Sequence, residues 1–179
     1  MRIGIDISQL AYEKTGVENY LSNLIKSLLK ADKANNYVLF FSSLRRDVSF
    51  SDFNIGNVRI KKIKLPPTLL SFLWNRLHVL PIEWFIGDID WLITSDWTEP
   101  PTRKAKKATI LYDLIVYKNP EETDNKIVRT QKLKLGWVKK ESNIIFCISE
   151  STKKDAQELL GIEENKLKVI YPGLEAQTC

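Results

Sequence analysis

Residues 144–173, IIFCISESTKKDAQELLGIEENKLKVIYPG, contain a complete strand–helix–strand unit. The apolar run 144–148 predicts a buried strand, and residues 167–171 predict a second strand that Pro172-Gly173 ends. Residues 152–160 between them have a helical pattern. Thr152 and Asp155 form a capping-box candidate, and Gly161 is expected to cap the end of the helix.

The same alternation continues toward the N-terminus. Strands are expected at residues 2–7, 37–41, 58–63, 91–94 and 109–112. Helices are expected at residues 17–29, 69–80 and 121–140, with a short helical turn at 81–85. Strands that alternate with helices are typical of a parallel sheet. The sequence therefore predicts an α/β, Rossmann-like fold: a mostly parallel sheet with helices on both faces.

The overall composition is that of an ordinary globular domain. The chain has 179 residues, 44% of them hydrophobic and 27% charged, and a net charge of +5. The two cysteines, Cys147 and Cys179, do not suggest a disulfide framework. The N-terminal apolar run is too short for a signal peptide, and no run is long enough to span a bilayer. We expect a cytoplasmic location, with peripheral contact at the inner face of the membrane as a further possibility.

Polar and small residues follow several of the predicted strands. Ligands of open parallel sheets bind beyond the carboxyl ends of the strands, so these positions are candidates for a cleft edge. Gly16 opens the first predicted helix, where a ligand phosphate can approach the backbone N–H groups. A glycine at the start of a helix is equally common as part of a turn, so the pattern alone leaves both interpretations open.

Four stretches, taken in order, resemble the N-terminal domain of the family-4, GT-B retaining glycosyltransferases. The first is MRIGIDISQL (1–10) followed by TGVENYLSNLIKSLL (15–29), which is similar to the opening strand, glycine loop and helix of the family. The others are DWLITSDWTEPP (90–101), ATILYDLIVYKNPEE (108–122) and residues 144–173. This chain has Tyr112 and Thr94 where the family often has histidines. Tyr112 can donate a hydrogen bond but cannot act as a base near neutral pH.

The resemblance implies half of a GT-B fold. Residues 1–173 would form the N-terminal, acceptor-side domain and residues 174–179 the start of a linker, with the C-terminal donor-binding domain absent. The implied function is transfer of a sugar from a nucleotide-sugar to a carbohydrate or lipid-linked acceptor, and the chain is expected to be inactive without a C-terminal half. Whether it is an enzyme on its own therefore stays open. The alternative is a non-catalytic binding or assembly subunit of a split glycosyltransferase.

The resemblance also implies roles for particular residues. Thr15 and Gly16 would let the donor phosphates approach the backbone. Ser149 and Thr152 would lie at the cleft edge. The expected acceptor contacts are Asp96, Trp97, Tyr112, Asp113 and Arg129. No catalytic residue is assigned, because retaining chemistry can use the leaving phosphate as the base, and neither a metal ion nor another cofactor is expected.

Other site patterns carry less weight. Asp88-Ile89-Asp90 has the form of a metal-binding DxD, but it precedes a predicted strand, so we interpret it as a turn at the opposite edge of the sheet. The stretch MRIGIDIS also resembles the first phosphate loop of actin-like sugar kinases, but it lacks the glycine and hydroxyl residues that would wrap ATP. No P-loop, dinucleotide fingerprint or zinc cluster is present. Nucleic-acid binding is not expected, because no recognition motif accompanies the charge.

The aromatic stretch LLSFLWNRLHVLPIEWF (69–85) has two interpretations. Core packing is the prediction for Trp74 and Trp84, as for the nearby Trp91, and His78 is expected in the core or on the surface. The alternative is a surface that lies on a membrane or lines an acceptor groove. The lysines and arginines of the helix at 121–140, and the cluster at 103–107, are predicted to be solvated. The alternative partners for the helix are lipid phosphates or an acceptor diphosphate.

Overall fold

The computed structural model describes residues 1–46, 48–53, 55–95 and 97–173. Its strands form one parallel sheet in the order β3-β2-β1-β4-β5-β6-β7. The strands are β1 (Arg2–Asp6), β2 (Asn36–Ser42), β3 (Val58–Ile63), β4 (Trp91–Ser95), β5 (Lys106–Leu111), β6 (Ile144–Cys147) and β7 (Leu167–Val169). The chain crosses from β1 outward to β3, then returns to the other side of β1 with β4. The predicted Rossmann-like parallel sheet is confirmed.

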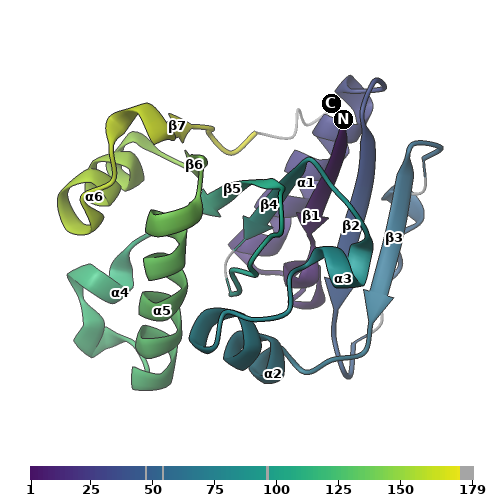
Figure 1. Cartoon of the computed structure of the whole chain (residues 1–179). Helices are drawn as coiled ribbons and strands as arrows, with labels where there is room; N and C mark the ends of the chain where they lie inside the picture. The colour runs from purple at the N-terminus through teal and green to yellow at the C-terminus, as the bar shows by residue number, and fades with distance from the viewer. Residues whose placement is uncertain (47, 54, 96, 174–179) are drawn as a thin grey trace.

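Helices cover both faces of the sheet, as predicted. One face carries α1 (Gly16–Ala31), while α2 (Pro67–Ser71), α3 (Glu83–Ile86) and α5 (Asn125–Glu141) lie in front of the sheet in Figure 1. The front face also carries α4 (Ile115–Lys118) and α6 (Glu150–Leu160). Short turns complete the elements: η1 (Ser8–Ala11), η2 (Ser51–Phe53), η3 (Phe72–Arg76), η4 (Pro120–Glu122) and η5 (Glu164–Lys166).

Burial explains why these segments form strands. Six of the seven residues of β2 are buried, because apolar helices cover this strand on both faces. Tyr37 and Leu39 pack under α1, whereas Val38 and Phe40 pack under α2 and α3. At Gly4 of β1, an added Cβ would lie 2.9 Å from Ile86 Cδ1, so the glycine lets α3 approach the sheet.

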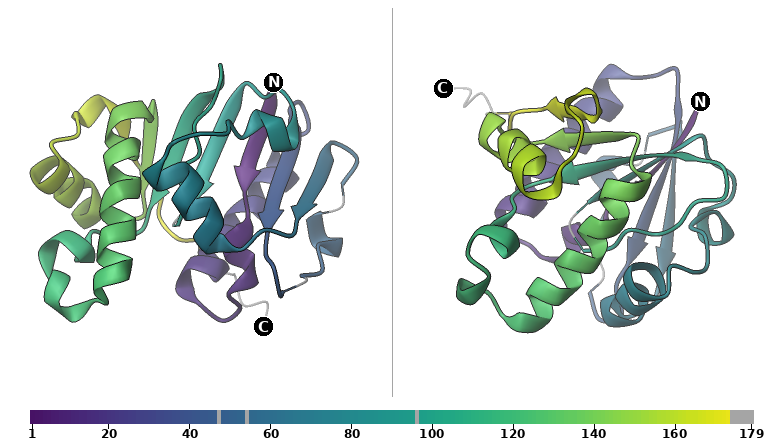
Figure 2. Two further views of the ribbon diagram at one scale, coloured as in Figure 1. Left: turned by 60° about the horizontal axis from the view of Figure 1, so that its bottom comes forward. Right: turned by 60° about the vertical axis from the view of Figure 1, so that its left-hand side comes forward.

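The apolar layer on the front face is divided in two. One core cluster lies under α2 and α3, and another lies under α4, α5 and α6. Between them, η3 packs against α5, and the two run side by side in both views of Figure 2. Buried polar and charged side chains fill this seam, among them Lys107 on β5 and Glu99 after β4.

Several local predictions are corrected by the structure. The helix expected at 69–80 ends at Arg76, because α2 continues only into one π-helical turn, η3. Ser149, rather than Thr152, caps α6 by accepting a hydrogen bond from the Thr152 N–H at 3.1 Å. Gly161 does cap the end of α6, with φ 62°. The turn at 88–90 lies at the amino edge of the sheet as expected, where Asp90 accepts a 2.7 Å hydrogen bond from the Arg2 N–H.

Some of the predictions about burial are confirmed and others are wrong. Trp74 is fully buried, which confirms core packing, but Trp84 is 66% exposed, so core packing is wrong for it. Lys134 on α5 and Lys107 on β5 are each only 2% exposed, although both were expected to be solvated. The hydrophobic pattern of the sequence does not reveal such buried lysines. A lysine is counted as polar, although its long aliphatic stem can pack like an apolar side chain. Across the described residues, no helix has the length and apolarity that crossing a membrane requires.

Candidate functional site

Three adjoining cavities lie at the carboxyl edge of the sheet, where the chain leaves β1, β4 and β5. In such sheets this edge, near the point where the strand order reverses, is where ligands bind. We call them the β1 cavity, the α1 cavity and the α5 cavity; their volumes are about 340, 700 and 300 Å³. Trp97 lines both the β1 and the α5 cavities, and Tyr112 and Asp113 line both the α1 and the α5 cavities. Four of the predicted site residues, Gly16, Trp97, Tyr112 and Asp113, therefore lie along one edge.

Thr15 and Gly16 begin α1. Thr15 caps the helix by accepting a 3.1 Å hydrogen bond from the Glu18 N–H, and its hydroxyl donates to the Tyr12 carbonyl at 2.9 Å. Gly16 lines the α1 cavity, while Thr15 is exposed outside it. A Cβ added at Gly16 would meet no atom within 4 Å. The fold itself does not require glycine here, so the open space above Gly16 is available to a ligand.

Tyr112 and Asp113 follow β5. The Tyr112 hydroxyl is 2.9 Å from Ser95 Oγ at the end of β4, and its ring meets the Tyr20 ring edge-on at 5.5 Å. Asp113 is exposed, and its carboxylate accepts a 3.1 Å hydrogen bond from the Ile115 N–H at the start of α4. A fixed phenol beside an exposed carboxylate can hydrogen-bond the hydroxyl groups of a sugar.

Trp97 is held by its backbone. The Trp97 carbonyl accepts a 2.8 Å hydrogen bond from Asn75 Nδ2, and Asn75 Oδ1 accepts from the Glu99 N–H at 2.9 Å. Asn75 is itself buried in η3. The loop after β4 is thus fixed to the front-face helices, which positions Trp97 between two cavities. Asp96, the neighbouring acceptor prediction, lies outside the described residues.

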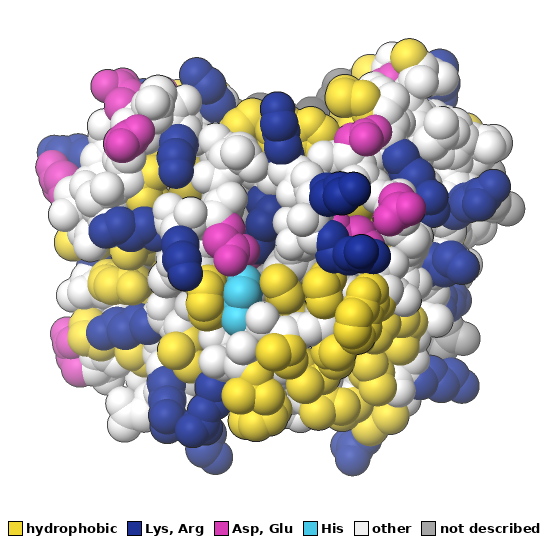
Figure 3. Space-filling view, viewed as in Figure 1, with side chains coloured by type: hydrophobic (Ala, Val, Ile, Leu, Met, Phe, Trp, Pro, Cys, Tyr) yellow, Lys and Arg dark blue, Asp and Glu magenta, His cyan; other side chains and the backbone are white. Residues whose placement is uncertain are grey.

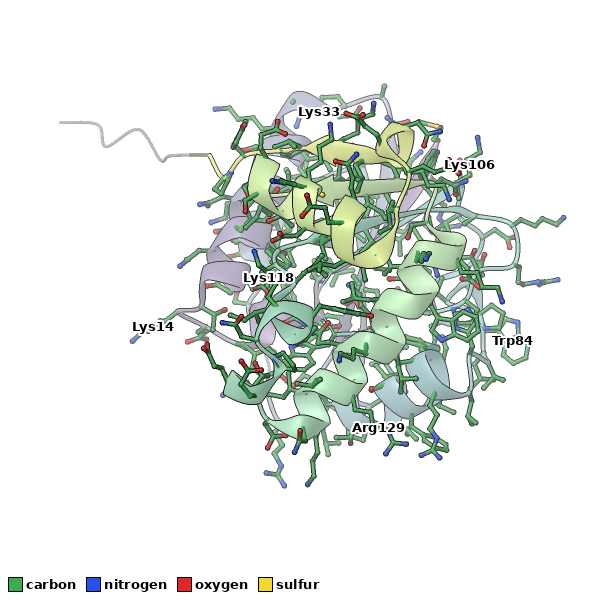
Figure 4. All side chains as sticks on the ribbon, turned by 90° about the vertical axis from the view of Figure 1, so that its left-hand side faces the viewer. Lys14, Lys33, Trp84, Lys106, Lys118 and Arg129 are labelled. Carbon is green, nitrogen blue, oxygen red and sulfur yellow. The ribbon has the colours of Figure 1, made fainter. Side chains whose placement is uncertain are left out.

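The remaining predicted residues lie away from the cavities. Arg129 is exposed on α5 (Figure 4) and lines none of the cavities found among the described residues. Ser149 and Thr152 also line none of them; Ser149 caps α6 by accepting from the Thr152 N–H, and Thr152 Oγ1 donates a 3.1 Å hydrogen bond to the Tyr112 carbonyl. Their contact with the cleft is therefore indirect, through the backbone of Tyr112.

Lys134 occupies the place that the sequence suggested for Arg129. It lies one and a half turns further along α5, is 2% exposed, and lines the α5 cavity with Trp97, Tyr112 and Asp113. Sequence reasoning missed it because six cations of this helix look alike in the sequence. The signal available was its spacing from Leu135 and Val138, since these apolar residues mark the buried side of α5.

Asp6 is a second residue that sequence reasoning missed. It ends β1, is 5% exposed and lines the β1 cavity. Its carboxylate accepts hydrogen bonds from the Ser8 N–H at 2.9 Å and from Thr98 Oγ1 at 3.2 Å. Burial raises the pKa of Asp6 above its ordinary value, although these hydrogen bonds oppose the rise. The arginines Arg45 and Arg46 lie at the same cavity, which therefore offers both a carboxyl group and cations.

A largely buried ionic network of Lys107, Glu99 and Glu141 lies next to the loop that follows β4. Lys107 Nζ is 2.9 Å from Glu99 Oε1 and 2.9 Å from Glu141 Oε2. The first contact is an ion pair without hydrogen-bond geometry; Glu99 is bound instead through Oε2, which accepts from Thr94 at 2.7 Å and Thr109 at 3.2 Å. Burial alone would raise the pKa of Glu141, but Lys107 and His78 together lower it. The network fixes Glu99, and through it the loop that carries Trp97.

Charged side chains of both signs line the cavities at this edge. Among the described residues, no group of three histidine, cysteine, aspartate or glutamate side chains could hold a metal ion. In the part of the chain that the structure describes, the charged groups at the three cavities are Asp6, Arg45, Arg46, Asp113 and Lys134. These side chains can bind hydroxyl and anionic groups.

Comparison with known proteins supports the fold assignment. No family model and no curated protein matches the sequence. Among solved structures, the chain is similar to the apo form of the lipopolysaccharide outer core galactosyltransferase WaaB, with a TM-score of 0.57 and 12% identity. The match covers 99% of this chain and 47% of the galactosyltransferase, so the chain spans about half of that protein.

A short-chain dehydrogenase/reductase from Veillonella parvula is also similar, with a TM-score of 0.46 and 8% identity over 82% of this chain and 67% of that one. The similarity to the galactosyltransferase, together with the seven-stranded parallel sheet, confirms the predicted Rossmann-like half of a GT-B fold. The chain is a glycosyltransferase-like domain in its fold.

Proposed function

We propose that this chain is the acceptor-side half of a retaining, family-4 GT-B glycosyltransferase. It would help to transfer a sugar from a nucleotide-sugar to a carbohydrate or lipid-linked acceptor. The single observation that carries the proposal is the match of nearly the whole chain to about half of a galactosyltransferase, with cavities at the sheet edge where that fold binds ligands.

The acceptor would occupy the β1 and α5 cavities. Trp97, shared by both, offers an aromatic face on which a sugar ring can lie, and Asp113 and Tyr112 offer hydrogen-bonding groups. Arg45 suits an acceptor phosphate, such as that of a lipid-linked sugar. The donor phosphates would approach at Gly16, where the N-terminus of the sixteen-residue helix α1 favours negative charge.

Transfer itself is proposed to need a second domain. Each cavity is open, so solvent reaches the edge, and transfer chemistry requires a site from which water is excluded. The chain's own contribution would be to bind and orient the acceptor. Tyr112 would orient an acceptor hydroxyl, because its phenol, held 2.9 Å from Ser95 Oγ, can donate and accept hydrogen bonds.

A two-dimensional amide NMR titration tests this proposal. UDP, GDP and short sugar acceptors are added in turn to the wild-type chain and to the variant Trp97→Ala. We expect an acceptor to move the amide signals of Trp97, Tyr112 and Asp113 in the wild type, and the response to be lost in the variant. Nucleotides alone should shift little. Tight binding of a nucleotide to this chain, or acceptor-induced shifts remote from the three cavities, would overturn the proposal.

A further inference from the structure

The segment from α2 to α3 exposes an unusual amount of apolar surface. Leu69, Phe72, Leu77 and Val79 are each 40–50% exposed, and Trp84 is 66% exposed. Figure 3 shows hydrophobic side chains gathered into one continuous area over α2 and α3, with the single histidine, His78, at its edge. Figure 4 shows the Trp84 indole at the periphery of the molecule, directed away from the ribbon. We call this area, defined by those five side chains, the apolar face.

The fold holds part of this face in an unfavourable backbone conformation. His78 and Leu80 have φ angles of 55° and 63°, in the left-handed region that is unfavourable for residues other than glycine. The loop is fixed by hydrogen bonds: the Val79 N–H donates to the Leu73 carbonyl at 3.0 Å, and Trp74 Nε1 donates to the Leu80 carbonyl at 2.9 Å. Leu77 and Val79 are therefore exposed on a loop that these hydrogen bonds connect to η3.

Cations border the apolar face on two sides. Arg76 is exposed, and its guanidinium lies 5.9 Å from the centre of the Phe72 ring. Arg103 and Lys104 are exposed next to α3, because the backbone N–H groups of both donate to Glu83 Oε1. Glu83 is the only carboxylate between residues 64 and 84, and it is buried. Residues 64–84 thus expose apolar groups and positive charge but no acid, whereas the exposed Asp88 and Asp90 line a cavity together with Arg103 and Lys104.

We propose that the apolar face docks on an anionic lipid bilayer. Aliphatic and aromatic side chains enter the boundary between headgroups and acyl chains, while Arg76, Arg103 and Lys104 meet the lipid phosphates. Tryptophan suits this position because its ring is apolar and its N–H can stay hydrated. A protein partner would need carboxylates matched to both cation groups around an apolar centre, whereas an anionic bilayer offers both features without a specific shape.

Docking would bring the β1 cavity close to the membrane. Leu70 of α2 lines that cavity, and its chain neighbour Leu69 belongs to the apolar face. The docking itself does not depend on the proposed glycosyltransferase function, since it rests only on this surface. If both hold, a lipid-linked acceptor reaches the cavity without leaving the bilayer.

Sedimentation with vesicles tests the docking. The wild-type chain is mixed with vesicles of phosphatidylcholine alone, and with vesicles that also contain phosphatidylglycerol. We expect binding only to the anionic vesicles, weakened by added salt. The variant Arg76→Gln/Arg103→Gln/Lys104→Gln should bind on the order of a hundredfold more weakly, since each cation contributes about fivefold. The variant Leu77→Glu/Trp84→Glu should lose binding by at least about tenfold.

Matched controls separate this face from general effects of charge and apolarity. Lys30→Gln/Lys154→Gln/Lys168→Gln removes the same charge from exposed lysines on α1, α6 and β7, and Leu159→Glu alters an apolar side chain of α6 that is 41% exposed. Both controls should bind like the wild type. No binding of the wild type, equal binding to neutral vesicles, or equal losses in the controls would overturn the proposal. So would self-association of the lipid-free chain that Leu77→Glu/Trp84→Glu abolishes, because a second copy would then cover the face.

Discussion

The buried ion pair between Glu99 and Lys107 gives the sharpest stability prediction. Glu99 is 0% exposed and Lys107 is 2% exposed, so neither charge is hydrated. In Glu99→Gln the side chain keeps its volume, and its amide oxygen can still accept from Thr94 and Thr109. Its amide N–H group, however, then faces the Lys107 ammonium, which leaves two donors opposed.

The expected loss of stability in Glu99→Gln depends on the ionic contact that Lys107 keeps. Removing one partner of a buried pair costs about 3–5 kcal/mol, because the other charge is left without compensation. Lys107 keeps its 2.9 Å contact with Glu141, so we expect the lower end, about 3 kcal/mol. For a chain of this length, that loss lowers the melting temperature by about 6–12 °C.

Urea unfolding followed by circular dichroism measures this difference. The matched control is Glu158→Gln, which breaks an exposed 3.7 Å pair with Lys154 and should change the free energy of unfolding by less than about 0.5 kcal/mol. The double variant Glu99→Gln/Lys107→Met should recover part of the loss, since the uncompensated ammonium is gone. If Glu99→Gln unfolds at the same urea concentration as the control, the argument for a buried ionic support behind Trp97 is refuted.

Three further predictions concern the carboxyl edge. Gly16→Ala should stabilise the chain by up to about 1 kcal/mol in thermal unfolding, because φ is not positive at Gly16 and an added Cβ meets no atom; a marked loss would mean that the backbone needs glycine there. Tyr112→Phe should cost about 1 kcal/mol, the hydrogen bond to Ser95, in urea unfolding, and Ser95→Ala/Tyr112→Phe should cost little more. Asp6→Asn should be at least as stable as the wild type at pH 7, since burial raises the pKa of Asp6 and so disfavours its charged form. Because the pKa of Asp6 is raised in the folded chain, its carboxyl contributes most to folding stability below the unfolded pKa of 3.8, and this contribution is lost as pH rises through the folded pKa. The stability advantage of Asp6→Asn should therefore disappear in unfolding curves measured near pH 3.

Local patterns sufficed for most of the elements. The strands at 58–63 and 144–148 were predicted within one residue of β3 and β6, because their periodicity and flanking turns are local signals. The helix expected at 69–80 was wrong beyond Arg76. Its end depends on His78, which stacks on Trp137 at 3.6 Å and pairs with Glu141 at 2.8 Å, and both partners belong to α5. No pattern within the segment reports contacts with a distant helix.

Some residues of the candidate site could likewise be predicted from local patterns, and others could not. Tyr112 and Asp113, which directly follow a strand, and Gly16, which opens the helix after the first strand, could be expected at one edge, because the carboxyl ends of parallel strands meet there. Lys134 could not be separated from Arg129 by charge, since only the rotation of α5 against the sheet buries one and exposes the other. Asp6 gave a local signal, its place at the end of a strand, but its burial against Thr98 depends on β4 lying beside β1.

The sequence by itself determined the class of fold and the edge at which polar residues gather, because hydrophobic periodicity and strand–helix order are properties of neighbouring residues. The tertiary structure alone decided which aromatic and charged side chains are buried. Trp74 and Trp84 are ten residues apart in one apolar stretch, yet one is fully buried and the other mostly exposed. The difference arises because burial is set by what packs against a side chain, and here that is the sheet and α5, whose residues lie elsewhere in the chain.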